Sequence, residues 1–169
     1  EIENVNKIMI FVNGERLLKL PHSEKYLPIE LDRSYGINKI YDLKTLKNIN
    51  KTTTYYISKI NNVDYYVPIT SIDNNTEEKI QIIIKNLKTS PIYQTNLISY
   101  LASSANLENY EILENAINLS FNNNLITNMN DSTMLEEVKY SIYLSLKDSY
   151  NIKSVIFEIP NQALSTLNN

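Results

Sequence analysis

The chain has 169 residues, with 16 Lys and Arg against 19 Asp and Glu, a single His and no Cys. The absence of cysteine excludes disulfides, thiolate catalysis and cysteine-ligated metal sites. A formal net charge of −3 without a clustered basic face argues against a nucleic-acid partner, and a hydrophobic content of 43% fits a globular domain better than a disordered chain or a membrane span.

The first predicted element is a strand at residues 7–12, where the sequence KIMIFV is β-branched and aromatic and leads into an Asn-Gly dipeptide. Ile8, Ile10 and Val12 alternate along one face, and the other face is apolar as well. A strand that is apolar on both faces is typically covered on both. We therefore expect it to add to a sheet edge, either of its own domain or of a second molecule.

Residues 21–51 predict a linker. They show no sustained period of 2 or 3.6, and Pro21 and Pro28 interrupt the pattern. Connections of this length without regular structure are uncommon inside one compact domain. The alternative is a long ordered loop that lies on the domain surface.

Two β-prone runs, residues 52–59 and 63–70, predict a hairpin with its turn at residues 60–62. The second run contains Pro68, which has no N–H to donate to a sheet ladder. We therefore expect the second arm to be an edge strand or to carry its proline at a non-bonded position.

The predicted hairpin carries two tyrosine pairs, Tyr55-Tyr56 and Tyr65-Tyr66. Strand alternation sends one member of each pair to the core and the other to the opposite face. Tyrosines that face outward would form a platform for a partner protein or a sugar. The alternative is that helices cover both faces, or that the hydroxyl groups simply reach water.

An amphipathic helix is predicted over residues 76–89, from a capping box at Asn75–Glu78 and apolar residues at i, i+3, i+4 and i+7. A shorter helix is predicted over residues 95–102. Both lie between the predicted hairpin and a second group of strands, which indicates an α+β order of elements.

The second half of the chain predicts a second hairpin, formed by residues 109–115 and 116–122. A second capping box at Thr133–Glu136 begins the longest helix, which continues to about Tyr150. Residues 154–159 form the closing strand, and a proline stops it.

The sequence of residues 5–20 echoes that of residues 152–167. Ile8 aligns with Val155 and Ile10 with Phe157, so a similar strand and apolar tail occur at both ends of the chain. If the repeat is real, the first copy of the strand ends a preceding domain. The alternative is a chance match between two β-prone runs.

The residues that catalysis needs are sparse. His22 is the only histidine, and two glycines are too few for a Gly-rich phosphate loop. The carboxylate pairs begin the two predicted principal helices, where negative charge complements the helix dipole. We therefore predict no catalytic residue, no cofactor and no metal site.

Several short motifs, in their order and spacing, resemble a GerMN domain of sporulation and germination proteins. They are VPIT at residues 67–70, NLSF at residues 118–121, the Glu136-Glu137 pair, and VIF at residues 155–157. The resemblance covers residues 52–160. It implies an α+β fold in which two principal helices pack on one face of a mixed or antiparallel sheet, as in ring-building motifs.

Taken with the internal echo, the resemblance divides the chain into three parts. Residues 1–20 are the terminal strand and tail of a preceding GerMN-like copy, residues 21–51 are the linker, and residues 52–169 are the GerMN-like domain. The family implies a lipoprotein of an endospore-forming bacterium that works in assembly and not in catalysis. Its implied place is outside the cytoplasm, on a lipid anchor beyond this sequence, between the mother-cell and forespore membranes.

The implied partners are proteins of the channel that joins these two membranes, and self-association through sheet edges is a further possibility. The candidate interface consists of the hairpin tyrosines and one face of the first strand: Tyr55, Tyr56, Tyr65, Tyr66, Ile8, Ile10 and Val12. The alternative function is an extracytoplasmic cell-wall or polysaccharide-binding module that uses outward tyrosine faces. A hydrolase would need a cleft with converging carboxylates, of which the sequence gives no sign.

Overall fold

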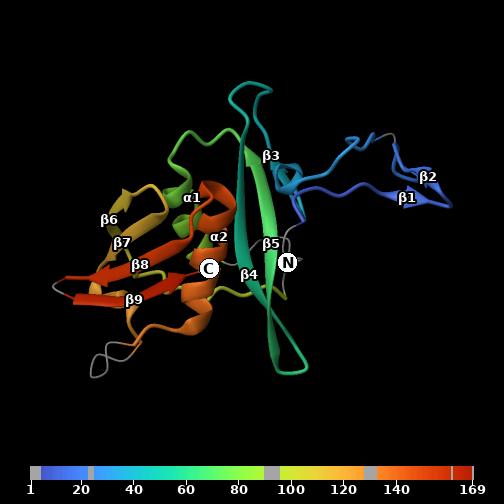
Figure 1. The fold of residues 1–169 in the computed structure, drawn as a ribbon. Coiled ribbons are helices and arrows are strands. Elements are labelled where there is room, and N and C mark those ends of the chain that lie inside the picture. The colour runs from blue at the N-terminus through green and yellow to red at the C-terminus, as the bar shows by residue number, and fades with distance from the viewer. Residues whose placement is uncertain (1–4, 23–24, 90–95, 128–132, 161, 169) are drawn as a thin grey trace. The chain divides into compact units, whose positions relative to one another are not determined.

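The computed structural model describes residues 5–22, 25–89, 96–127, 133–160 and 162–168 (Figure 1). The chain divides into two compact units, Glu1–Gly36 and Ile37–Asn169. The boundary falls inside the predicted linker, whose second half belongs to the second unit. The assignment of residues 1–20 to a preceding domain copy stays a prediction.

The first unit is built around a short antiparallel hairpin of β1 (Phe11–Val12) and β2 (Glu15–Arg16). Asn13 and Gly14 form its turn at φ of 52° and 83°, the left-handed backbone that Asn and Gly tolerate best. A separate bridge joins Ile8 to Leu31 through two hydrogen bonds of 2.9 Å. The strand predicted over residues 7–12 is therefore regular only at its end. A single 3₁₀ turn, Arg33–Tyr35, closes the unit.

The second unit begins with a three-stranded sheet in the order β3-β5-β4. β4 (Asn50–Ile60) and β5 (Val63–Asp73) form the predicted hairpin, longer than expected, and Asn61 and Asn62 turn it with φ of 51° and 63°. β3 (Ile40–Asp42) pairs in parallel with the end of β5. This strand lies in the predicted linker, which is therefore not irregular throughout.

Pro68 occupies a non-bonded position in the hairpin, as one of the two alternatives expected. It lies opposite Tyr55, whose N–H points away from β5 and donates to Ser145 Oγ over 2.9 Å. The proline therefore removes no bond from the β4–β5 ladder. Its carbonyl oxygen accepts a hydrogen bond of 2.9 Å from the Asn38 side chain.

A mixed four-stranded sheet forms the other side of the second unit, in the order β6-β7-β8-β9. β6 (Leu107–Ile112) and β7 (Ala116–Phe121) are the second predicted hairpin, and β8 (Ser154–Ile159) lies parallel to β7. β9 (Gln162–Asn168) then returns antiparallel to β8. The prediction that β8 closes the chain is thus wrong, because Pro160 begins a tight turn into β9.

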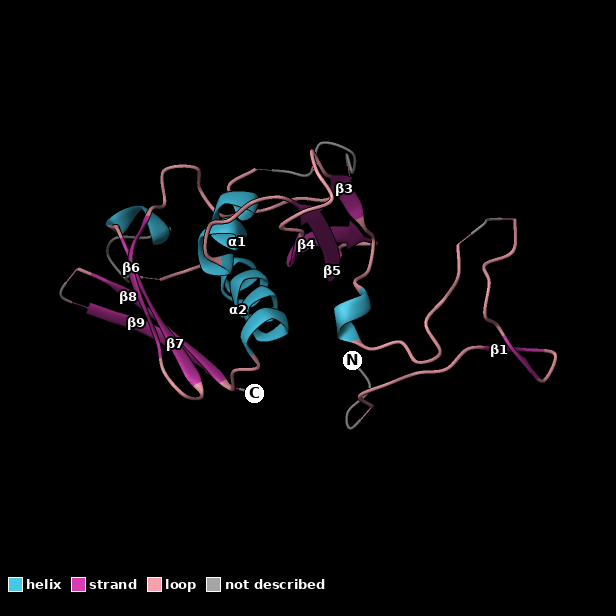
Figure 2. Ribbon diagram, turned by 90° about the horizontal axis from the view of Figure 1, so that it is seen from above, coloured by secondary structure: helices cyan, strands magenta, loops and turns pink. Residues whose placement is uncertain are grey.

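Two helices, α1 (Lys79–Leu87) and α2 (Glu136–Tyr150), lie between the two sheets (Figure 2). They cover one face of the four-stranded sheet, and the β4–β5 hairpin covers their other side. α1 is therefore buried beyond its predicted stripe, since Ile82 is only 2% exposed. One core joins both sheets, with Tyr56 and Ile69 from the hairpin and Phe121 and Phe157 from the four-stranded sheet. The predicted α+β class with a mixed sheet is confirmed.

Neither helix begins with the predicted capping box. Glu78 and Leu135 occupy the N-cap positions, and neither makes a side-chain cap. At α1 the Tyr150 hydroxyl accepts from the Ile80 N–H over 3.2 Å, so a tertiary contact satisfies a group that a local cap was expected to satisfy.

The short helix predicted over residues 95–102 is not formed at residues 96–102, and Thr95 lies outside the described residues. Instead, Ile98 pairs with Ile57 through two backbone hydrogen bonds of 2.8 Å. The outer edge of β4 needs partners there, and this segment supplies them in an extended conformation. A 3₁₀ turn, Asn123–Leu125, follows β7.

The internal echo extends to strand register. Val12 pairs with Glu15 and Phe11 with Arg16 in the first hairpin. In the last hairpin Ile159 pairs with Gln162 and Glu158 with Ala163, and each residue number is larger by 147. The match covers the two residue pairs next to each turn. Beyond them β8 and β9 shift register between Phe157 and Glu158, whereas Leu17 N still donates to the Ile10 carbonyl oxygen in the first hairpin, so the repeat stays a prediction.

Candidate interaction surfaces

β4 packs against α2 by its edge, and small side chains make this possible. Ser141 and Ser145 are both buried on α2. Ser145 Oγ accepts from the Tyr55 N–H over 2.9 Å and donates to the Ser141 carbonyl oxygen over 2.6 Å. A larger side chain at position 145 would hold the strand away from the helix, so this serine fixes where the hairpin base sits.

Edge-on packing buries both members of the first tyrosine pair. Tyr55 and Tyr56 point to opposite faces of β4, yet they are only 9% and 5% exposed. Tyr55 Oη donates to Asp148 Oδ2 over 2.9 Å, and Tyr56 Oη donates to the Asn86 carbonyl oxygen over 3.2 Å. Burial raises the pKa of Tyr56 to about 12. The predicted alternation therefore holds, neither tyrosine faces outward, and of the two alternatives the one with both faces covered applies to this pair.

The second tyrosine pair alternates as expected. Tyr66 is half-buried, and its ring centroid lies 5.9 Å from that of Tyr140 on α2. Burial, with smaller contributions from Glu137 and Asp64, raises the pKa of Tyr66 to about 12. Tyr65 faces the other way and is 49% exposed.

Tyr65 belongs to an exposed apolar cluster at the end of the hairpin. Ile60 and Val63 lie opposite each other on the same face as Tyr65, and they are 55% and 51% exposed. We call these three residues the hairpin tip. Its apolar side chains cluster at the free end of an element whose base is fixed by α2.

The predicted face of the first strand is exposed within this chain. Ile8, Ile10 and Val12 are 52%, 37% and 49% exposed. The opposite face is exposed as well, where Arg16 lies 5.8 Å from the centroid of the Phe11 ring. The described residues of the first unit therefore do not supply the expected cover, and cover by a sheet edge elsewhere, by a second molecule or by a preceding domain stays a prediction.

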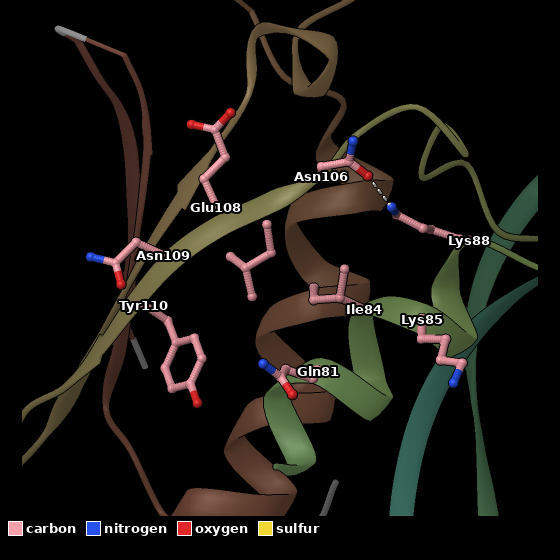
Figure 3. A pocket seen from close by; sticks show the side chains of 9 residues that line it. Gln81, Ile84, Lys85, Lys88, Asn106, Glu108, Asn109 and Tyr110 are labelled. Atoms are coloured by element: carbon pink, nitrogen blue, oxygen red, sulfur yellow. Dashed lines mark hydrogen bonds between the residues drawn. The ribbon is translucent and has the colours of Figure 1, made fainter. Parts of the chain in front are cut away.

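A groove of about 420 Å³ lies between α1 and β6 (Figure 3). α1 lines it with Gln81, Ile84 and Lys85, and its C-cap residue Lys88 follows on the same face, at i, i+3, i+4 and i+7. The strand side is lined by residues 106–110. Ile84 is part of the core, and Leu107 and Tyr110 pack against it, so these three form an apolar floor.

The charged groups at this groove lie mainly on its helix side. Lys88 Nζ donates to Asn106 Oδ1 over 2.6 Å, which links the helix to the start of β6. Lys85 Nζ lies 3.7 Å from Glu77 Oε1, and both side chains are well exposed. Glu108 also lines the groove, but its carboxylate points away from α1 (Figure 3). Lys88 therefore directs its positive charge toward the strand side of the groove, whereas Glu77 balances the charge of Lys85.

No local sequence pattern predicts this groove. The polar stripe of Gln81, Lys85 and Lys88 could be read from the helical spacing, and Tyr110 from the strand pattern. Their juxtaposition depends on β6 being the edge strand beside α1, which no local pattern indicates.

A second hollow, of about 400 Å³, lies where β3 and β5 end, and it is lined by Asp42, Lys44, Asp73, Asn74, Asn75 and Lys85. The Asn74 side chain accepts from the Lys44 N–H over 2.7 Å and donates to the Lys47 carbonyl oxygen over 2.7 Å. It therefore holds the loop after β3. Within the described ranges, no group of three or more His, Cys, Asp or Glu side chains could hold a metal ion.

No helix in the described part of the chain is long and apolar enough to cross a membrane.

The described carboxylates near the helix starts have local partners. Glu136 Oε1 lies 2.6 Å from Lys139 Nζ, one turn along α2. Glu78 Oε2 accepts from the Tyr150 hydroxyl over 3.4 Å.

No family model matches the chain. The chain is 26% identical over 164 residues to the spore germination protein GerM of Bacillus subtilis (strain 168), and the match takes in 94% of this chain. The same match takes in 45% of GerM, so the chain spans less than half the length of this curated relative.

Two solved structures are similar. The tandem GerMN domains of the sporulation protein GerM from Bacillus subtilis match with a TM-score of 0.82 at 23% identity, over 98% of this chain and 61% of that chain. A putative lipoprotein from Clostridium perfringens matches with a TM-score of 0.45 at 15% identity, over 73% of this chain and 90% of that one, which is too distant to carry an argument. The sequence match and the shared fold confirm the resemblance to a GerMN domain.

Proposed function

We propose that this chain, a GerMN-type domain in sequence and in fold, is a non-enzymatic assembly module of a sporulation and germination protein. In this proposal it contributes to the complex between the mother-cell and forespore membranes. The similarity to GerM supports the sporulation context. The observation that carries the assembly role is the hairpin tip, an exposed apolar cluster at the end of an element that α2 fixes at its base.

The hairpin tip has the physical properties of a contact site. Its three apolar side chains share one face, so a partner could bury all three together. Burial of such a cluster at the centre of an interface supplies binding free energy roughly in proportion to its area, about 25 cal/mol per Å². The clamped base limits the entropy that binding would cost.

The carboxylates near the helix starts support a structural role over a catalytic one. Glu136 pairs with Lys139 and Glu78 with Tyr150, within and between elements of the scaffold. Acid–base catalysis by a carboxylate pair needs two such groups to face one substrate site. We therefore assign assembly, and not hydrolysis, to this domain.

We also propose that the whole protein is a lipid-anchored lipoprotein that works outside the cytoplasm, with channel proteins as its partners. Within it, residues 1–20 would be the last strand and tail of a preceding GerMN-like copy. The matching register of the two residue pairs next to the turn of each hairpin supports this assignment. In a longer protein that contains the preceding copy, the amides of Ile8 and Ile10 should exchange at least tenfold more slowly than in this chain. Equal exchange rates in the two proteins would contradict it.

The assembly proposal is tested by site-specific photo-crosslinking in sporulating cells. A photo-reactive phenylalanine replaces Tyr65 in the full-length protein, and a matched variant carries it at Tyr41, an exposed tyrosine on β3. We expect crosslinks to channel proteins from position 65 and not from position 41. Crosslinks to glycan without protein would favour the polysaccharide-binding module instead, and equal crosslinking from both positions would remove the hairpin tip as the interface.

A further inference from the structure

The turn between β1 and β2 carries the one Asn-Gly step of the sequence. Of the two glycines in the chain, Gly14 follows Asn13 and Gly36 follows Tyr35. In an Asn-Gly step the backbone nitrogen of the glycine can attack the carboxamide carbon of the asparagine side chain, because glycine has no Cβ to obstruct the approach. Asparagine is accordingly counted among the thermolabile residues of proteins. This step is therefore a position where the chain can modify itself without an enzyme.

The surroundings of the turn leave the two reacting groups accessible. Asn13 and Gly14 are both exposed, and nothing lies within 4 Å of a Cβ built on Gly14. Among the described residues, no backbone hydrogen bond engages the Gly14 N–H. Neither neighbouring atoms nor a backbone hydrogen bond therefore holds the attacking nitrogen in place, and water reaches the site.

The first hairpin is also small enough to let Asn13 move. The attack requires the Asn13 side chain and the Gly14 nitrogen to rotate toward each other, away from the geometry of the closed turn. β1 and β2 are joined over two residue pairs, and the hydrogen bond of 2.8 Å from Leu17 N to the Ile10 carbonyl oxygen follows them. A two-stranded hairpin of this size is marginally stable, so local opening gives Asn13 access to reactive conformations.

The other described asparagines with left-handed backbone differ from Asn13. Each precedes a residue with a side chain, whose Cβ obstructs the attacking nitrogen. The pair Asn61 and Asn62 is the nearest analogue, since it also turns a hairpin, but the two strands that it joins are eleven residues long and α2 fixes their base. Both the following residue and the stability of the hairpin therefore single out Asn13.

We propose that Asn13 deamidates spontaneously and that the isoaspartate product opens the first hairpin. The Gly14 nitrogen forms a bond to Asn13 Cγ and loses its proton, and the carboxamide nitrogen leaves as ammonia, which produces a five-membered succinimide. One water molecule then opens this ring at either carbonyl carbon, which yields aspartate or isoaspartate. The net reaction consumes one water and releases one ammonia. This modification goes beyond the assembly function and does not depend on it.

The two products have different effects on the hairpin. Aspartate keeps the normal backbone, and Asp-Gly is favoured in the same type of turn as Asn-Gly, so it adds only a negative charge. Isoaspartate routes the main chain through the side-chain CH₂ group, which lengthens the turn by one atom. The two-residue turn sets the pairing of Val12 with Glu15, so the longer turn disrupts it. Only isoaspartate is therefore expected to open the hairpin.

The reaction is tested by incubating the purified chain at mildly alkaline pH and mapping its tryptic peptides by mass spectrometry. Trypsin releases residues 8–16, in which Asn13 is the single asparagine. We expect deamidation there to be at least tenfold faster than in the peptide that contains Asn61 and Asn62, and labelling by an isoaspartate methyltransferase to identify the isoaspartate. Equal rates in the two peptides would overturn the proposal.

A synthetic peptide of residues 8–16 tests whether the folded turn protects Asn13. The intact chain should deamidate within about tenfold of this peptide, because the hairpin opens readily. A rate more than a hundredfold slower in the intact chain would overturn the proposal.

Gly14→Ala tests the attack itself, because it places a Cβ beside the attacking nitrogen where the structure has room for it. It should slow deamidation by at least tenfold, and its amide exchange at Leu17 should not change during the incubation. Deamidation at the rate of the wild type would exclude the proposed attack by Gly14.

Asn13→Asp separates the added charge from the lengthened backbone. Amide exchange at Leu17 should be at least tenfold faster in the purified isoaspartate form than in the fresh protein, and unchanged in Asn13→Asp. Equal acceleration in both would assign the effect to charge and contradict the proposed opening by isoaspartate. Unchanged exchange in the isoaspartate form would show that the hairpin tolerates the longer turn, which would contradict it as well.

Discussion

The first and last hairpins of the chain share a sequence pattern and the register of the two residue pairs next to the turn, but they differ in burial. Val155, Phe157 and Ile159 in β8 are at most 7% exposed. Their counterparts Ile8, Ile10 and Val12 are 37–52% exposed. In both hairpins two residues separate the paired strands.

The difference lies in the neighbours. β8 has β7 on one side and β9 on the other, and its inner face contributes to the core together with α2. Among the described residues β1 pairs with β2 alone, over two residue pairs. A two-stranded hairpin without a third strand or a helix is marginally stable in water. An apolar strand pattern therefore defines a surface to be buried, and the neighbours decide whether it is.

The largest expected difference between the two hairpins appears when side chains at equivalent positions are truncated to alanine. Phe157→Ala removes a fully buried ring and is expected to lower the free energy of unfolding by about 3–5 kcal/mol. Ile10→Ala, at the equivalent position of the first hairpin, should change it by less than about 1 kcal/mol. Urea denaturation of both variants measures the difference. Similar losses would mean that the first hairpin is also packed in solution.

A second test of the contrast is the pH dependence of stability in the second unit, where Tyr56 is buried. Burial holds the Tyr56 hydroxyl protonated to about pH 12, while in the unfolded chain it ionises near pH 10. The folded state then binds more protons than the unfolded state, so stability is constant below about pH 10 and falls between pH 10 and 12. The share of Tyr56 is on the order of 2 kcal/mol for a shift of this size.

Denaturation at a series of alkaline pH values measures this loss. Tyr56→Phe removes the titrating group, so its stability should fall less steeply above pH 10 than that of the wild type. It also loses the hydrogen bond to the Asn86 carbonyl oxygen, which lowers its stability at neutral pH. Identical slopes in the two proteins would exclude Tyr56 as the source, and leave Tyr66 and Tyr150, whose pKa values burial also raises to about 12.

Local pairing is the part of the fold that the sequence predicts well. The β4–β5 and β6–β7 hairpins, the alternation of β7 and β8 and the long helix α2 all follow from patterns within about twenty residues. β3 and β9 do not. β3 is three residues long and depends on a parallel partner distant in sequence. β9 lacks a clear alternation of apolar and polar residues. It follows Pro160, and a proline at that position can mark either the end of the last strand or a turn into another one.

The candidate site could be predicted only in part. Alternation separates Tyr65 from Tyr66, as the structure confirms. The burial of Tyr55 and Tyr56 depends on two small serines of α2 that lie about ninety residues away in sequence. The α1–β6 groove needs the order of strands in a sheet, which is a global property of the fold. Local sequence patterns therefore do not predict surfaces that form where distant segments pack together.

A smaller effect is expected from the turn of the first hairpin. Gly14 has φ of 83°, and nothing lies within 4 Å of a Cβ added there. Gly14→Ala therefore meets no steric contact but places a side chain on left-handed backbone, which costs about 1 kcal/mol. We expect faster amide exchange at Leu17, which donates to the Ile10 carbonyl oxygen, and an unchanged unfolding transition of the second unit. A lower transition would show that the two units unfold together.

The smallest effect is expected from the ion pair beside the Ile8–Leu31 bridge. Lys7 Nζ lies 2.7 Å from Glu30 Oε2, and this contact lowers the pKa of Glu30 and raises that of Lys7. Any stability it adds is present above the usual pKa of Glu and is lost as pH falls through the lowered pKa. Both side chains are largely exposed, so water and salt screen the attraction.

Glu30→Gln should therefore leave amide exchange at Ile8 and Leu31 unchanged at neutral pH, as measured by NMR. The two backbone hydrogen bonds of the bridge persist without the charge. Exchange that accelerates tenfold would instead show that the ion pair holds the bridge closed. Electrostatic attraction would then stabilise the first unit, whereas packing stabilises the second. The two hairpins would differ in their stabilising forces as well as in their neighbours.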